Sequence, residues 1–185
     1  MFIPSIYPKI YILLKSTKYF KMKAFKFRLY LTINQSNHLS QHIRSCRFVY
    51  NCARNQKVKT HELIGRSISR FDFDKLIPNL KKQNQWLREA NYQSLQAMTK
   101  KIESTFIRFF REKNGFPKFK SKKSPIQSFL IPKHYNVNFE NDTIKLPKIG
   151  ETKAVLYKTF LKRITNHYYF KILHIKVLYP HFSGR

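Results

Sequence analysis

One change of hydrophobic period, near residue 32, constrains the fold of this chain more than any other feature. Residues 24–31 (AFKFRLYL) alternate apolar with basic or polar side chains, which is typical of a β-strand with one buried and one cationic face. From Leu39 to about Glu62 the apolar side chains recur every three or four residues instead, which predicts an amphipathic helix. Thr32 and Gln35 have the spacing of a capping box at its start.

The helical pattern continues well beyond the first helix. Asp72 can cap a short helix, which Pro78 would bend or end. The pair Trp86-Leu87 is expected to dock the following turn onto the core. A stronger apolar stripe from Gln93 to Lys113 predicts another helix, and we interpret this stripe as core packing rather than as a cofactor site.

Short β-like runs then replace the helical pattern. One strand, a helical block and several further strands indicate an α+β fold, in which a small antiparallel sheet or barrel is interrupted by a helical insertion. Asn141 and Asp142 suit a tight hairpin turn. The predicted strands after the block are 128–132, 135–140, 143–146, 152–157 and 168–178.

The charge of the chain indicates its class of partner. It carries 37 Lys and Arg residues against 9 Asp and Glu residues, a formal charge of +28 with neutral histidines. With 42% apolar and 16% aromatic residues it should fold rather than remain disordered. Such a charge opposes compaction unless a polyanion neutralises it. Nucleic acid is therefore the expected partner, with an anionic membrane surface as the competing hypothesis.

The most basic stretch, residues 113–133, contains six lysines and no acidic residue. Phe116, Phe119 and Phe129 are interleaved with the lysines, and their rings could stack on unpaired bases or anchor the loop in the core. Two arginines on the first helix, off its apolar stripe, could also face nucleic acid. The predicted contacts to nucleic acid from these two segments are Arg44, Arg47, Lys113, Lys118, Lys120, Lys122 and Lys123.

Residues 1–21 contain an apolar run that is too short to span a bilayer and is flanked by Lys9 and Lys15. We expect an extension outside the core fold rather than a signal peptide or membrane anchor. Cys46 and Cys52 have no histidine pair at metal spacing to complete a zinc site. We interpret both as reduced, half-buried side chains.

Metal-dependent cleavage of phosphodiesters typically requires converging carboxylates. The close acidic pairs are Asp72 with Asp74, which look like a helix cap and first turn, and Glu140 with Asp142, which look like turn chemistry. No acidic residue follows Glu151. The sequence therefore predicts binding rather than catalysis.

A series of short motifs, each in the expected order, resembles the amino-terminal region of the OrfB/TnpB family of transposon-encoded proteins. The resemblance covers about residues 22–164. The motifs are residues 23–31 with the T-x-x-Q that follows, CRFVYN (46–51), WLRE (86–89), SLQ (94–96), FFR (109–111), GFPKFKSKK (115–123), QSF (127–129) and LPKIG (146–150).

The resemblance implies a β-barrel wedge domain (22–32 plus 113–178) interrupted by a helical recognition domain (33–112) with a helix-turn-helix, between an extension (1–21) and a tail (179–185). It also implies RNA-guided DNA cleavage by a RuvC-like nuclease domain further along, with a guide RNA from the transposon end. Tyr92, Gln93 and Gln96 match the stretch that reads a short DNA motif, and a glutamine can pair with adenine in the major groove.

Two departures from the family pattern change the expectation for this chain. Leu130 stands where relatives commonly have threonine, which removes a possible polar contact to DNA. The chain also stops before the family's first catalytic aspartate, so its Mg²⁺ and Zn²⁺ sites would lie outside, and we expect no cofactor and no nuclease centre. The expected protein is a cytoplasmic, nucleoid-associated fragment that binds DNA and guide RNA but no membrane.

Two alternatives remain open. One is a basic RNA-associated or membrane-surface protein without a transposon role. The other is an active nuclease that uses carboxylates not recognised above.

Overall fold

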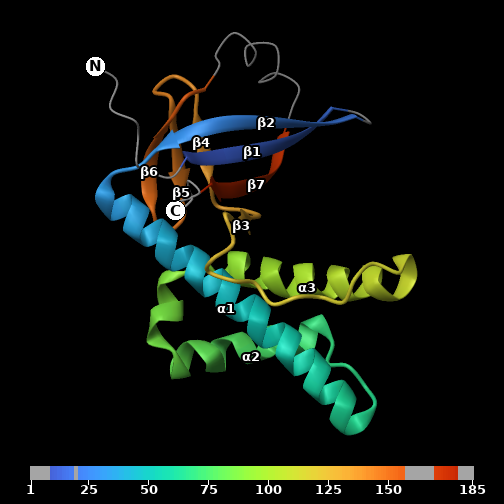
Figure 1. Cartoon of the computed structure of the whole chain (residues 1–185). Helices are drawn as coiled ribbons and strands as arrows, with labels where there is room; N and C mark the ends of the chain where they lie inside the picture. The colour runs from blue at the N-terminus through green and yellow to red at the C-terminus, as the bar shows by residue number, and fades with distance from the viewer. Residues whose placement is uncertain (1–8, 19–20, 157–168, 179–185) are drawn as a thin grey trace, which may run out of the picture. The chain divides into compact units, whose positions relative to one another are not determined.

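The computed structural model describes residues 9–18, 21–156 and 169–178 (Figure 1). The chain divides into two compact units. The sheet unit comprises Met1–Leu39 and Lys123–Arg185, and the helical unit comprises Ser40–Lys122. The predicted helical domain ended at residue 112, whereas the helical unit also includes the basic loop, because α1 (Ile33–Ile64) binds that loop through side chains described below.

The described strands form one antiparallel sheet in the order β3-β7-β1-β2-β6-β5-β4. The closed barrel that the resemblance implied is wrong for these strands, because β3 and β4 are the two edges of an open sheet. Closure would require β3 to pair along β4, which spans only three residues. The strands are β1 (Lys9–Lys18), β2 (Lys21–Tyr30), β3 (Ile126–Ile131), β4 (Asn136–Asn138), β5 (Thr143–Leu146), β6 (Gly150–Ala154) and β7 (Tyr169–Leu178).

Strand β1 corrects the expectation that residues 1–21 lie outside the core fold. It lies between β2 and β7 in the sheet (Figure 1), and Ile10 pairs with Leu29 on one side and Val177 on the other. An apolar run of four to eight residues is too short for a membrane but has the length of a strand.

The alternation predicted for residues 24–31 is confirmed where β2 side chains are described. Phe27 and Leu29 are buried, whereas Tyr30 is 49% exposed. Strand β3 buries Phe129 and Ile131 in the same alternating manner. The β4–β5 hairpin corrects the tight turn predicted at residues 141–142, because Asn138 pairs with Thr143 and residues 139–142 form a four-residue loop in which Asp142 is left-handed (φ 50°).

The capping box at the start of α1 is confirmed. The Thr32 backbone N–H donates to Gln35 Oε1 (3.1 Å), and the Gln35 N–H donates to the Thr32 hydroxyl (3.3 Å). The Gln35 amide also donates to the Glu151 carbonyl (2.6 Å). This last bond ties the start of α1 to the beginning of β6, within the sheet unit.

Helix α2 (Arg70–Gln83) begins one turn earlier than predicted. Ser69 is its N-cap, and Asp72 lies in the first turn, where its N–H donates to the Ser69 hydroxyl (3.2 Å). The helix runs through Pro78. Proline lacks the N–H that would bond to the carbonyl four residues earlier. That carbonyl, of Asp74, instead accepts from the Tyr92 hydroxyl (3.5 Å).

A 3-10 turn (Gln85–Glu89) leads to α3 (Tyr92–Glu112), whose N-cap Asn91 accepts from the backbone N–H groups of Gln93 and Ser94. None of the helices in the described residues is long and apolar enough to cross a membrane. The three helices share one apolar core, in which the residues at most 5% exposed include Ile43, Val49, Ala53, Ile77, Leu87, Leu95, Met98 and Ile102.

Candidate nucleic-acid interface

The basic loop after α3 is held on α1 by two polar side chains. The Asn51 amide donates to the Lys120 carbonyl (3.0 Å) and its oxygen accepts from the Lys120 N–H (2.9 Å). Arg54 Nε donates to the Pro117 carbonyl (2.7 Å). These bonds satisfy backbone groups of a segment that has no regular secondary structure of its own. They hold the backbone of the loop on α1, and so fix the positions of the Cα atoms from which its lysine side chains extend.

The interleaved aromatic rings divide between the two roles that the sequence left open. Phe129 is buried in the sheet unit. Phe116 packs edge-to-face on Phe106 (5.9 Å between centroids) and Phe109 (5.2 Å), so it anchors the loop. Phe119 is 54% exposed, with the Arg54 guanidinium 3.9 Å from its ring centroid. Phe119 is the most accessible of the three rings, although Phe116 is itself 45% exposed.

The five lysines predicted to contact phosphates are not equivalent. Lys113, Lys118, Lys122 and Lys123 are exposed. Lys120 is half-buried, and its amine lies 5.1 Å from the centroid of the Tyr50 ring. Burial, and then the positive charge of Lys101, lower the pKa of the Lys120 amine from its usual 10.5 to about 8.

A hollow of about 630 Å³ lies on the face of α1 beside this loop. The Arg44 guanidinium lies 4.9 Å from the centroid of the Trp86 ring, and Phe48 packs edge-to-face on the same ring at 5.1 Å. No Asp or Glu is among its lining residues in the described part of the chain. We call it the Trp86 groove, lined by Arg44, Arg47, Phe48, Asn51, Cys52, Asn55, Trp86 and Phe119.

The sequence pointed to three lining residues of the Trp86 groove, Arg44, Arg47 and Phe119, but not to Phe48, Asn51, Cys52, Asn55 or Trp86. It placed Trp86 on the core with Leu87, but Leu87 alone is fully buried, and Trp86 lines the groove. A usable signal was present in the helical spacing. Residues 44, 47, 48, 51 and 55 recur at three and four positions, which places them on one face of α1 opposite the apolar stripe.

The three residues that match the motif-reading stretch lie in the first two turns of α3, outside the lining of the Trp86 groove. Tyr92 packs toward α2, because its hydroxyl bonds to Asp74 and the Lys81 amine lies 5.3 Å from its ring centroid. Gln93 and Gln96 are both half-buried. The predicted contact residues therefore occupy three places: the loop, the groove and the start of α3.

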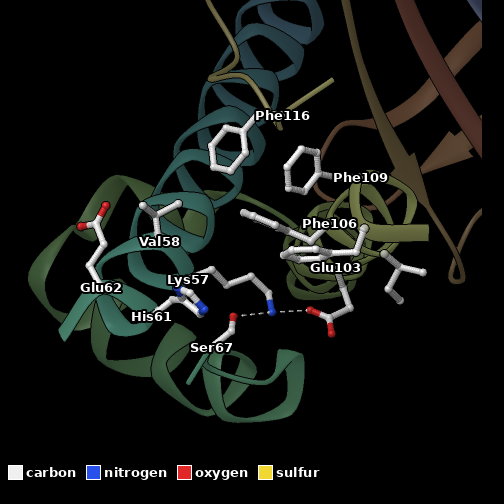
Figure 2. Close-up of a pocket in the computed structure, with 11 residues that line it drawn as sticks. Lys57, Val58, His61, Glu62, Ser67, Glu103, Phe106, Phe109 and Phe116 are labelled. Atoms are coloured by element: carbon white, nitrogen blue, oxygen red, sulfur yellow. Dashed lines mark hydrogen bonds and ion pairs between the residues drawn. The ribbon is translucent and has the colours of Figure 1, made fainter. Parts of the chain in front are cut away.

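A second hollow, of about 480 Å³, differs in character (Figure 2). Figure 2 shows the Lys57 amine between Glu103 and Ser67. Its Nζ lies 2.6 Å from Glu103 Oε2 and donates to the Ser67 hydroxyl (3.3 Å) and the Ile68 carbonyl (2.8 Å). We call this the phenylalanine hollow, lined by Lys57, Val58, His61, Glu62, Ser67, Glu103, Phe106, Ile107, Phe109, Phe110 and Phe116.

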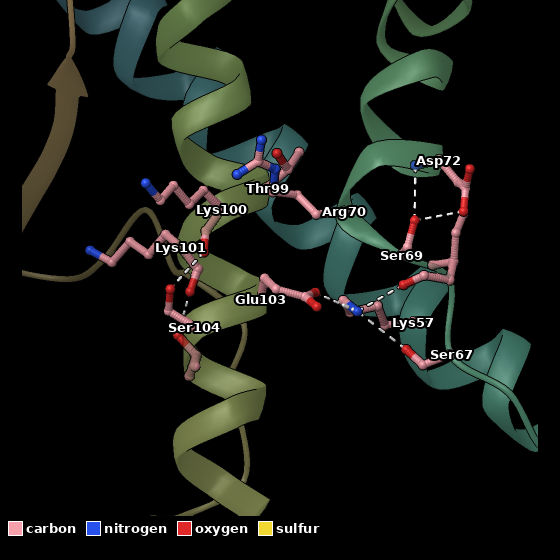
Figure 3. A network of polar contacts seen from close by, with 12 residues as sticks. Lys57, Ser67, Ser69, Arg70, Asp72, Thr99, Lys100, Lys101, Glu103 and Ser104 are labelled. Atoms are coloured by element: carbon pink, nitrogen blue, oxygen red, sulfur yellow. Dashed lines mark hydrogen bonds and ion pairs between the residues drawn. The ribbon is translucent and has the colours of Figure 1, made fainter.

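The acidic pair of α2 is engaged in structural bonds. The buried Asp74 carboxylate accepts from the Thr99 hydroxyl (2.5 Å), and this hydrogen bond joins α2 to α3. The same carboxylate lies 3.5 Å from Arg70 Nε, within α2. Asp72 accepts from the Ser69 hydroxyl (2.6 Å) and from Lys75 (3.4 Å); Figure 3 shows the bonds between Asp72 and Ser69. Both carboxylates thus have partners that stabilise α2.

The two cysteines are shielded from solvent to different degrees. Cys46 is buried, and burial raises the pKa of its thiol to about 12. Burial also raises the pKa of the half-buried Cys52 thiol. A thiol with a raised pKa is a poor nucleophile and a poor metal ligand. Within residues 9–18, 21–156 and 169–178, no three His, Cys, Asp or Glu side chains are grouped to hold a metal ion.

Comparison with known proteins matches residues 22–62 to a family described as a helix-turn-helix domain, of the OrfB type found in insertion sequences. In the structure these residues form β2 and most of α1, a single uninterrupted helix. The turn that follows, with Gly65 in a left-handed conformation (φ 67°), and helix α2 lie after the matched residues.

Two relatives confirm the resemblance to the OrfB/TnpB proteins. A protein of Escherichia coli (strain K12), named RNA-guided DNA endonuclease InsQ, is 31% identical over 132 residues, which are 70% of this chain and 33% of the relative. A protein of Streptomyces pristinaespiralis, named as an RNA-guided DNA endonuclease, is 28% identical over 55% of this chain and 26% of the relative. The chain thus matches about a third or less of each relative's length.

Proposed function

We propose that this chain is a transposon-associated protein of the OrfB type that binds DNA and a guide RNA. One observation carries the proposal: α1 holds the lysine-rich loop through Asn51 and Arg54, and also presents Arg44 and Arg47 in a groove that no acidic residue of the described ranges lines. A formal charge of +28 and the names of the two relatives support it.

The exposed lysines of the loop neutralise phosphates. Each such contact releases condensed counterions, so affinity falls steeply as salt rises. Lys113, Lys118, Lys122 and Lys123 supply these contacts directly, because their side chains are exposed. Lys120 contributes from its half-buried place on the Tyr50 ring. The main effect expected from this loop is sequence-independent binding to the sugar-phosphate backbone of the nucleic acid.

Reading of a DNA motif is assigned to the start of α3. Gln96 and Gln93 carry amides that can donate to and accept from an adenine edge. Tyr92 is 39% exposed and borders them. This assignment rests on the match to the family motif and on the position of the three residues in the first turns of the helix.

Binding by the described residues proceeds without cleavage and without a metal ion. Asp74 is bonded to Thr99 and Arg70, and Asp72 is bonded to the cap of α2. Asp142 is part of a turn, and its carbonyl accepts from the Ala154 N–H (2.8 Å). We expect complex formation to persist in EDTA, and supercoiled plasmid to stay uncut in Mg²⁺.

The test is a salt titration of oligonucleotide binding, with two triple variants of equal charge. Changing Lys118, Lys122 and Lys123 together to Gln should lower the slope of log affinity against log salt by about 2 to 3. The control changes the exposed Lys59, Lys82 and Lys145 to Gln, which removes the same three charges elsewhere. Equal losses in both variants would mean that net charge alone binds nucleic acid. Salt-independent binding would overturn the proposal outright.

A further inference from the structure

We propose that the Trp86 groove binds an unpaired nucleotide of a single strand, whose base stacks on the exposed ring of Phe119 beside the half-buried ring of Trp86. This inference deepens the proposed function and rests on it, because the strand must first be held by the cationic surface. The groove is not the adenine-reading site at the start of α3, since Tyr92, Gln93 and Gln96 are absent from its lining.

The aromatic rings of the groove are supported from behind. Phe48 packs edge-to-face on Trp86, and the Arg54 guanidinium lies 3.9 Å from the Phe119 ring centroid. Arg54 is itself fixed by its bond to the Pro117 carbonyl. A ring held in this way loses little conformational freedom when a base stacks on it. Phe119 remains 54% exposed, so one side of its ring is accessible to a ligand.

The polar groups of the groove suit the other parts of a nucleotide. Arg44 and Arg47 are placed to receive a phosphate, and Arg guanidinium groups bind phosphate in a bidentate manner. Asn51 is occupied by the Lys120 backbone. Asn55, one helical turn further along α1, is exposed and can donate to and accept from a base edge.

The geometry favours an unpaired nucleotide over a duplex. Stacking on a side chain requires a base whose face is not covered by neighbouring bases. A volume of about 630 Å³ lies within the range of pockets that hold small organic ligands. A duplex would offer only its phosphates to the two arginines, and the aromatic rings would add nothing to its affinity.

The experiment uses the full 185-residue chain and its single tryptophan, Trp86. Because no other residue is a tryptophan, intrinsic fluorescence reports directly on the groove. The probes are a 12-nucleotide thymidine strand, an abasic strand of the same length and charge, the uridine counterpart, and a duplex. We expect the two base-containing strands to quench Trp86 and to bind at least about fivefold more tightly than the abasic strand.

Two variants localise the effect. Phe119→Leu should lower affinity for the thymidine strand about fivefold and leave affinity for the abasic strand unchanged. Arg44→Gln should weaken binding of both strands, because it removes a phosphate contact. Circular dichroism establishes that each variant folds, and the abasic comparison on the unaltered chain does not depend on the variants.

The outcomes separate the two proposals. Equal affinity for thymidine and abasic strands, without quenching, overturns the stacking site while leaving nucleic-acid binding intact. Absence of binding to all four probes overturns the proposed function itself. Tighter binding of the uridine strand than of the thymidine strand would assign the site to RNA, and the reverse order to DNA; either supports an unpaired nucleotide as the ligand.

Discussion

The Trp86 groove and the phenylalanine hollow, both in the helical unit, combine aromatic and cationic side chains in different ways. Both are lined by aromatic rings and at least one cation. In the phenylalanine hollow the cation is Lys57, which is paired with Glu103 and bonded to Ser67 and the Ile68 carbonyl. In the Trp86 groove the cations are arginines, and among the residues that the structure describes no carboxylate lines it.

This difference separates a packing feature from a binding feature. A buried amine is tolerated when its charge and hydrogen bonds are satisfied within the protein, and the amine of Lys57 then joins α1 to α3. A guanidinium lying on a ring, in a groove without acidic groups, keeps its electrostatic attraction for an external anion. Aromatic content alone therefore does not identify the interface. The presence or absence of a carboxylate beside the cation distinguishes the two hollows.

Lys57→Met tests the packing side of the comparison and should have the largest effect. The variant leaves the Glu103 carboxylate and the Ile68 carbonyl without their shared donor. Breaking a fully buried pair costs about 3 to 5 kcal/mol. Because the Glu103 side chain is 34% exposed, we expect the free energy of unfolding to fall by about 2 kcal/mol, measured by urea denaturation.

Lys59→Met is the matched control for that substitution, on the same helix but exposed. It should change the free energy of unfolding by less than about 0.5 kcal/mol. Affinity of the folded Lys57→Met variant for oligonucleotides should stay within the error of the salt titration. A variant of Lys57 that kept full stability but lost binding would reverse the roles of the two hollows.

Two phenylalanines of one loop give the next largest effect and compare the hollows directly. Phe116→Leu loses edge-to-face contacts with Phe106 and Phe109, so stability should fall by about 1 kcal/mol. Phe119 is only slightly more exposed than Phe116 (54% against 45%), but its ring contacts the Arg54 guanidinium rather than two aromatic rings, so Phe119→Leu should affect stability less. Thermal unfolding of the two variants, side by side, distinguishes these cases. Equal losses of stability would mean that Phe119 is also a packing residue.

Local sequence signals predicted much of the fold. Thr32 and Gln35 gave the start of α1, and strand β5 has the predicted bounds 143–146. Both depend on short-range patterns, which act within a few residues. The open sheet and the inclusion of β1 could not be obtained in this way, because pairing of β1 with β7 joins residues about 160 positions apart and depends on which partner edge is available.

The candidate site was predicted in composition but not in arrangement. The lysines of residues 113–123 were identified from charge alone, while the bonds of Asn51 and Arg54 to that loop link residues more than 60 positions apart. The position of Trp86 could not be predicted from the sequence either. Its neighbour Leu87 supplies the buried side chain of that turn, and a hydrophobic pair gives no indication of which member faces a groove.

The smallest effect concerns Lys120, which contrasts with Lys57 because cations rather than a carboxylate surround it. Burial and the charge of Lys101 lower the pKa of the Lys120 amine to about 8, below its usual 10.5. Between these values the unfolded chain binds more protons than the folded chain at this residue. The contribution of Lys120 to the free energy of unfolding should therefore rise as pH increases from about 8 to about 10.5. Lys120→Met should remove that rise.

The same titration tests whether Lys120 contacts a phosphate. If it does, oligonucleotide affinity should fall as pH rises through about 8, by up to about fivefold, the value of a partly exposed ion pair. Lys120→Arg keeps its charge across this range and should bind with a flatter pH profile than the unaltered chain. Anisotropy titrations at pH 7 and pH 9 measure both. Identical pH profiles for the two proteins would mean that the Lys120 amine does not contact a phosphate and serves only in packing on the Tyr50 ring.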